Sequence, residues 1–191
     1  MIKKDGFTII ELLMASLIIT IGLMAVISMI ISAFTSTASL SFNLTASYLT
    51  QEGFEVVRRI RDTNFNRLYS DDAVDEDTYF WLENLMDESE DSVVGGLDYD
   101  SDELIQGKED ETFYINDGLY SYEPSSQETT FRREITLERD CYAGYADTND
   151  FDDDYCGSDG AEYVLVTVEV TWEERETERS HKAKTKLFNW Y

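Results

Sequence analysis

The sequence predicts an α+β fold in which one long amino-terminal helix packs against a carboxy-terminal antiparallel sheet. Residues 12–51 contain no charged side chain, and apolar residues then recur at helical spacing as far as residue 60. Towards the carboxyl end, apolar and polar residues alternate with period two, the pattern of half-buried strands. The chain of 191 residues is long enough for one small domain beyond the helix.

Residues 7–34 have the length and composition of a membrane-spanning helix. They would rise about 42 Å at ~1.5 Å per residue, more than the ~30 Å hydrocarbon core of a bilayer. Lys3 and Lys4 precede this segment, and positive charges flanking a span stay in the cytoplasm. We therefore expect a single-pass protein of the inner or cytoplasmic membrane, with its amino terminus in the cytoplasm and the part after about residue 35 outside.

Residues 35–68 predict an amphipathic continuation of the same helix. Charged pairs four residues apart, Glu55 with Arg59 and Arg58 with Asp62, indicate an exposed face. The apolar stripe expected to meet the sheet consists of Phe42, Ala46, Leu49, Gly53, Val56, Val57, Ile60 and Leu68.

Residues 69–191 predict the globular domain. A cluster of apolar residues suggests a short helix over 79–87, and Asn116-Asp117-Gly118 is a strong hairpin turn. The strands expected are 112–115, 119–122, 129–139, 162–172 and 181–191. In the strand 162–172 alternate valines share a face that can pack on the helix, and in 181–191 lysines line one face.

The residues Gly6-Phe7-Thr8-Ile9-Ile10-Glu11 resemble the prepilin signature. The resemblance implies a type IV pilin or pseudopilin: a membrane peptidase removes the leader 1–6 after Gly6, and the new terminal Phe7 is methylated. Glu11 then takes the place of the family's glutamate at the fifth mature position. It also implies the type IV pilin-like architecture, and residues 51–65 look like the corresponding helix of minor pilins.

Glu11 is the one charge within the apolar segment 7–51. A carboxylate at the centre of a spanning helix costs about 2.5–3.5 kcal/mol on insertion scales, so it needs compensation. We expect the α-amino group of a cleaved neighbouring subunit's Phe7 to supply it during assembly. The alternative is that Glu11 lies near the membrane interface and complements the helix dipole.

The strongly acidic composition restricts the partners of this chain. The formal net charge is −25, from 40 acidic and 15 basic residues. Nucleic-acid binding needs clustered Lys and Arg, so nucleic acid is an unfavourable partner. His181 is the one histidine and has no nucleophile motif beside it, so we expect no enzymatic activity.

Cys141 and Cys156 are the two cysteines, and both fall in the part expected outside the cytoplasm. A disulfide is the natural interpretation there, and a metal site is the weaker one because no histidine lies nearby. Many pilins close a carboxy-terminal loop with such a bond, which the resemblance implies here as well.

Two acidic segments raise the hypothesis of bound calcium, although no cofactor is required. One segment has the spacing of an EF-hand loop but carries Glu103 where the glycine belongs. Its candidate ligand positions are Asp98, Asp100, Asp102, Leu104, Gln106 and Glu109. The other segment lies between the cysteines and offers Asp147, Asn149, Asp150, Asp152, Asp153 and Asp154. The alternative for both is a solvated acidic loop.

The sequence thus predicts a structural subunit, in the manner of a minor pilin, of a type IV pilus-like filament. Its expected partners are other pilin subunits, the prepilin peptidase, the assembly machinery and, before assembly, the membrane. The filament would be extracellular or periplasmic. The alternatives are a pseudopilin of a type II secretion or competence system, and an adhesive or cation-binding tip module carried on a pilin anchor.

Overall fold

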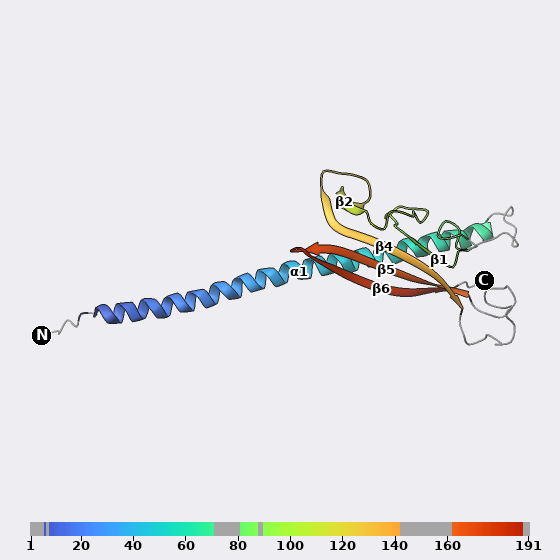
Figure 1. Ribbon diagram of the computed structural model, residues 1–191. Coiled ribbons are helices and arrows are strands. Elements are labelled where there is room, and N and C mark those ends of the chain that lie inside the picture. The colour runs from blue at the N-terminus through green and yellow to red at the C-terminus, as the bar shows by residue number, and fades with distance from the viewer. Residues whose placement is uncertain (1–5, 7, 71–80, 88–89, 142–161, 189–191) are drawn as a thin grey trace. The chain divides into compact units, whose positions relative to one another are not determined.

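A computed structural model describes residues 6, 8–70, 81–87, 90–141 and 162–188. The chain divides into two compact units, residues 1–42 and 43–191. Helix α1 (Ile9–Ser70) begins in the first unit, and the rest of it belongs to the second (Figure 1). The prediction of one long helix is therefore confirmed.

Several hydroxyl side chains in the first part of α1 donate to backbone carbonyls of the same helix. The Ser16 and Thr20 hydroxyls donate to the carbonyls of Leu13 and Leu17, at 2.9 and 2.8 Å. Thr35 donates to Ser32 in the same way, at 2.9 Å. Such bonds matter in lipid, where no water is present to pair with a free hydroxyl.

The second unit contains a six-stranded antiparallel sheet. The order is β3-β2-β4-β5-β6, and β1 also pairs with β4 (Figure 1). The strands are β1 (Ser92–Gly95), β2 (Thr112–Asn116), β3 (Leu119–Ser121), β4 (Glu128–Cys141), β5 (Glu162–Glu174) and β6 (Thr177–Phe188). Among the described strands β6 is thus one edge of the sheet, and the two long antiparallel strands β4 and β5 form its centre.

Two-residue turns connect two of the neighbouring strand pairs, β2 with β3 and β5 with β6. Between β2 and β3, Asp117 and Gly118 both have positive φ, 50° and 87°, as the predicted Asn-Asp-Gly turn requires. Between β5 and β6, Arg175 and Glu176 adopt the same left-handed region with φ of 53° and 63°. Neither residue is a usual choice there, so the sequence alone gives little sign of this second two-residue turn.

The core lies between the second part of α1 and the inward face of the sheet. The valines of β5 predicted to face the helix are buried, and they pack with apolar residues of β4 and α1. The buried members of the predicted helix stripe are Ala46, Leu49, Gly53, Val56, Val57 and Ile60. Gly53 is the point of closest approach, because a Cβ there would lie 3.1 Å from Cγ1 of Val168.

Three local predictions differ from the structure. Residues 81–85 form turns rather than a short helix, although Trp81, Leu82, Leu85 and Met86 are buried as a cluster. Strand β1 was not predicted, because four residues with two valines give too short a pattern. The ion pairs within the helix are Glu55 with Arg58 at 2.9 Å and Asp62 with Arg61 at 2.7 Å, instead of Glu55 with Arg59 and Arg58 with Asp62.

We predict that Gly53→Val lowers the free energy of unfolding of the second unit by about 1–3 kcal/mol, because the added methyls meet Val168. Chemical unfolding of the full chain in detergent, followed by the fluorescence of buried Trp81 and Trp172, measures it. Gly22→Val is the matched control, since nothing lies within 4 Å of a Cβ at that position. Equal effects of the two substitutions would contradict the packing assigned to Gly53.

Candidate functional site

The first candidate site is the exposed apolar surface of the first unit. All residues from 8 to 34 are exposed in the single chain, and large side chains such as Met29 and Phe34 are about three-quarters exposed, at 76% and 74%. In the described residues one helix is long and apolar enough to cross a membrane, and this is its apolar part. An apolar surface of this extent requires lipid or protein around it.

Glu11 lies in the first turn of α1, at the start of this surface. Its backbone N–H donates to the Thr8 hydroxyl at 3.3 Å, so Thr8 caps the helix. Sequence reasoning missed this cap, although Thr8-Ile9-Ile10-Glu11 has the spacing of a capping box and could have revealed it. Gly6 is exposed just before the helix, and Phe7 lies outside the described residues.

The acidic segment with EF-hand spacing is held by hydrogen bonds of its own. One Asp98 carboxylate oxygen accepts from the Ser121 hydroxyl at 2.7 Å and from the Tyr122 N–H at 3.0 Å, and the other accepts from the Tyr99 N–H at 2.8 Å. Glu109 accepts from the Gly107 N–H at 2.8 Å.

These contacts leave the calcium hypothesis without structural support in this segment. Asp100 and Asp102 are exposed, and Leu104 and Gln106 line a shallow depression instead of a coordination shell. Among the described residues no group of three or more His, Cys, Asp and Glu side chains is placed to hold a metal ion.

The second acidic segment and the cysteine pairing stay predictions. Cys141 ends β4, and Cys156 lies outside the described residues. So do all the candidate calcium ligands between the two cysteines, namely Asp147, Asn149, Asp150, Asp152, Asp153 and Asp154.

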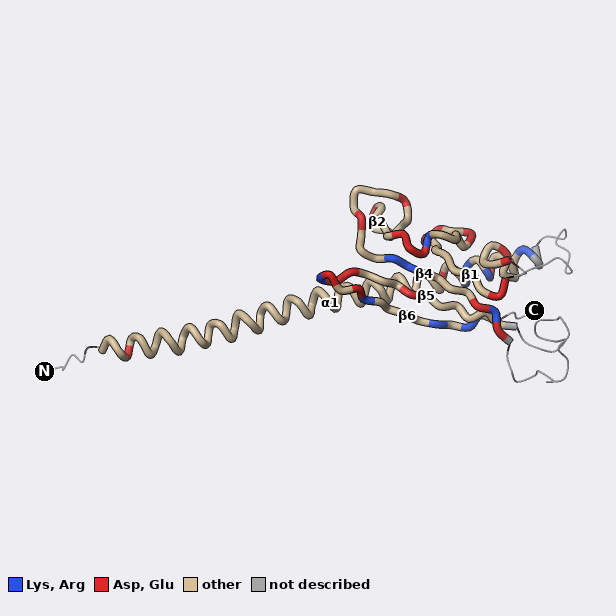
Figure 2. The backbone as a smooth tube through the Cα atoms, in the orientation of Figure 1, with Lys and Arg blue, Asp and Glu red and all other residues tan. Residues whose placement is uncertain are grey.

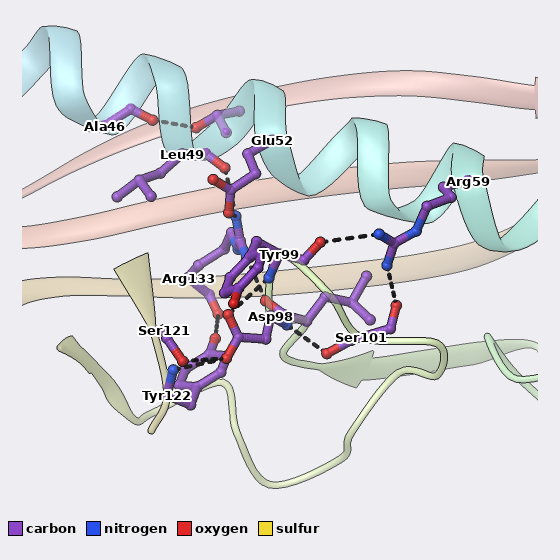
Figure 3. A network of polar contacts seen from close by, with 12 residues as sticks. Ala46, Leu49, Glu52, Arg59, Asp98, Tyr99, Ser101, Ser121, Tyr122 and Arg133 are labelled. Atoms are coloured by element: carbon purple, nitrogen blue, oxygen red, sulfur yellow. Dashed lines mark hydrogen bonds and ion pairs between the residues drawn. The ribbon is translucent and has the colours of Figure 1, made fainter. Parts of the chain in front are cut away.

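The second candidate site is a buried polar network centred on Arg133 of β4 (Figure 3). The side chain of Arg133 is fully buried. Its Nη1 donates to the Leu49 carbonyl and to the Glu52 carboxylate, both at 2.9 Å, and its Nη2 donates to the Leu97 carbonyl. The guanidinium also lies 5.0 Å from the ring centroid of Phe113, within cation–π range.

This arginine joins three parts of the second unit. It connects the strand that carries it to the helix and to the segment after β1, and Figure 3 shows it reaching from β4 towards the turn of α1 that holds Leu49 and Glu52. Arg59 fixes the same segment a few residues on, donating to the carbonyls of Tyr99 and Ser101 at 3.2 and 2.7 Å. A buried cation is stable only when such partners replace water.

Tyr122 completes the network. Its hydroxyl donates to the Arg133 carbonyl at 3.2 Å, and its ring stacks on Phe113 with centroids 4.6 Å apart. Burial is the main reason that the pKa of Tyr122 rises from 10.0 to about 12. The network therefore binds and positions parts of the fold. Both terminal nitrogens of the Arg133 guanidinium are paired within it, whereas its buried Nε has no hydrogen-bond partner among the described residues.

Comparison of this chain with protein-family models, with curated proteins and with solved structures gives no match.

We predict that Arg133→Ala lowers the free energy of unfolding by about 3–5 kcal/mol, because the buried carbonyls lose their donor and the site loses volume. Glu52→Gln is the matched control. Because the Glu52 side chain is 34% exposed, water replaces the lost charge interaction there, and a change of about 1 kcal/mol or less is expected. Thermal and chemical unfolding of the two variants measure this difference, and similar losses in both would place the stabilisation in the ion pair instead.

We predict a loss of stability of about 2–3 kcal/mol between roughly pH 10 and pH 12 from Tyr122 alone. Below this window both the folded and the unfolded chain keep the phenolic proton. Within it only the unfolded chain releases the proton, so rising pH favours unfolding. Tyr122→Phe removes this contribution, and the difference in unfolding free energy between the two proteins should therefore change across the window. A difference independent of pH would contradict the assignment.

Proposed function

We propose that this chain is a structural subunit of a type IV pilus-like filament, in the manner of a minor pilin, processed by a prepilin peptidase. The observation that carries the proposal is the junction Gly6-Phe7-Thr8-Ile9-Ile10-Glu11 at the start of a helix whose residues 9–34 are all exposed. With no match among known proteins, the assignment depends on these residues and on the α+β arrangement.

The placement of the cleavage site explains why the apolar helix would stay on the product. An ordinary secretory signal is cut after its apolar region, so the mature protein loses it. Here the cut after Gly6 removes six residues and leaves the whole apolar segment on the mature chain. That segment then spans the membrane until the subunit enters a filament, where the helices of other subunits replace the lipid.

Glu11 gives this exchange its selectivity. Lipid chains and apolar side chains surround an apolar helix about equally well. Helix association within a membrane therefore depends on packing and on polar pairs. The positive α-amino group created at Phe7 by cleavage is a suitable partner for a carboxylate close to the helix start. Processing and assembly are then linked, because an uncut chain has no such amine at that position.

The second unit would form the outer, folded part of the subunit. We propose that a disulfide between Cys141 and Cys156 closes the segment that follows β4. In the chain-entropy model a loop of this size contributes about 3 kcal/mol, which is useful in a small domain.

We predict that Glu11→Ala still inserts into the membrane but that its recovery in sheared surface filaments falls roughly tenfold or more, the ratio that corresponds to 1.4 kcal/mol. The reason is that the amine of the neighbouring subunit loses its partner. Glu11→Asp, which keeps the charge, is the control and should retain most of the incorporation. Quantitative immunoblots of filament and membrane fractions measure both. Wild-type incorporation of Glu11→Ala would refute the role of the carboxylate.

A further inference from the structure

Strand β6 carries a concentration of positive charge that is unusual for this chain. It holds four basic residues, Arg179, Lys182, Lys184 and Lys186, and one acidic residue, Glu178, whereas the whole chain has 15 basic and 40 acidic residues. The three lysines alternate along the strand and therefore share one face, and all three are exposed. We call Lys182, Lys184 and Lys186 the lysine stripe.

The stripe lies on β6, and no other strand in the described part of the chain pairs with the outer side of this strand. Lys182 pairs with Glu169 of β5 at 2.8 Å, and Lys186 lies 4.0 Å from the ring centroid of Tyr163. These contacts hold both ends of the stripe in place. Lys184 lies between them, opposite the buried Thr167, and its ammonium group is left at the surface.

The complementary negative charge lies beyond β4, towards the edge of the sheet opposite to β6. Strands β1 and β2 pair with β4 on the side away from β5 and β6, and residues 98–111 connect them. This connection, which we call the acidic loop, contains seven acidic residues and one basic residue, Lys108. Its acidic residues are Asp98, Asp100, Asp102, Glu103, Glu109, Asp110 and Glu111. In Figure 2 blue marks the lysine stripe of β6, and red recurs along the acidic loop.

The acidic loop is held in one conformation. Arg59 binds two of its carbonyls, and Gly96 forms a bridge to Ile105 across its base. The negative charge of the loop raises the pKa of Tyr99, and the neighbouring Asp100 is the chief cause. A fixed acidic surface of this kind can receive a row of cations without first being ordered.

We propose that the lysine stripe of one copy docks on the acidic loop of the next copy. This inference rests on the proposed filament function, which brings many copies side by side. The two surfaces lie on opposite sides of the sheet, so the contact is head-to-tail and leaves one stripe and one loop free at the ends of any assembly. A contact of this type propagates in one direction, as a filament requires, whereas a two-fold contact would need the stripe and the loop of each copy to lie in one and the same interface.

This contact would determine which copy lies next to which, and in what orientation, more than it would add binding strength. Exposed ion pairs are individually weak and are screened by salt, while complementary charge selects the correct surface and disfavours the wrong one. Lysines on an edge strand also discourage uncontrolled strand pairing. The lysines disfavour pairing with most other strands, but their positive charge still attracts an acidic protein surface.

Zero-length carbodiimide cross-linking of the full-length chain tests the contact. This reagent joins a lysine amine to a carboxylate with loss of water, so it records only ion pairs in contact. Equal amounts of unlabelled and ¹⁵N-labelled chain are placed in one membrane preparation, and peptides are analysed by mass spectrometry. We expect isotopically mixed peptides that join Lys184 to the acidic loop. The built-in control is Lys108, which pairs with Glu111 of the same chain at 2.6 Å and should give unmixed peptides.

Charge reversal provides the second readout. The triple variant Lys182→Glu, Lys184→Glu, Lys186→Glu should retain its unfolding temperature within a few degrees and form mixed cross-linked dimers about tenfold less, a factor that corresponds to 1.4 kcal/mol. Adding Asp100→Lys, Asp102→Lys and Glu103→Lys should restore dimers between the two reversed surfaces, and a folded chain with all six substitutions that forms no dimers would overturn the docking contact.

The two proposals fail separately. Filaments that assemble without mixed peptides between the lysine stripe and the acidic loop would overturn the docking contact and leave the filament function intact. Mixed peptides in membranes, with the chain uncut and absent from surface filaments in cells that contain an active processing peptidase, would support the docking contact and contradict the filament function. Mixed peptides from Lys184 to unrelated acidic residues, equally abundant throughout the chain, would also overturn the docking contact.

Discussion

The two parts of α1 are suited to two different environments, and the rest of the structure depends on this division of the helix. From residue 9 to residue 34 the side chains of α1 are exposed all round and mostly apolar. From Ala46 to Ile60 a single stripe is buried against the sheet and the opposite face is polar. The first pattern suits a surrounding of lipid or other helices, and the second suits a surface between a core and water.

Burial of Arg133 shows how the second part of this helix is fixed to its sheet. An apolar residue at that position of β4 would also pack, but it would not bind the Leu49 and Leu97 carbonyls together. Because a guanidinium has several donors in a fixed plane, it specifies the relative positions of strand, helix and connecting segment. The close contact at Gly53 works in the same region, since Val168 and the aliphatic part of Arg133 occupy the space where a side chain would be.

Hydropathy and periodicity were sufficient to predict the main elements. The long helix, the hairpin at Asp117-Gly118 and the strands β4, β5 and β6 follow from patterns that extend over many residues. The prediction of a short helix around Trp81 was wrong, because four apolar residues fit a helical turn and an irregular buried cluster equally well. In the alternating pattern of β4, Arg133 falls on the same inward face as Ile135 and Leu137. A charged residue at a position expected to be apolar was the signal that could have identified it. Its partners Leu49, Glu52 and Leu97 are 84, 81 and 36 residues away, which no local pattern encodes.

The central claim is that the chain is cut after Gly6 and that its apolar helix leaves the lipid for a filament. Intact mass spectrometry of the chain recovered from sheared surface material measures this most directly. We expect a mature polypeptide that starts at Phe7, carries one added methyl group and lacks residues 1–6. Recovery of the chain only from membranes, with Met1 to Gly6 still attached in cells that contain an active processing peptidase, would contradict it.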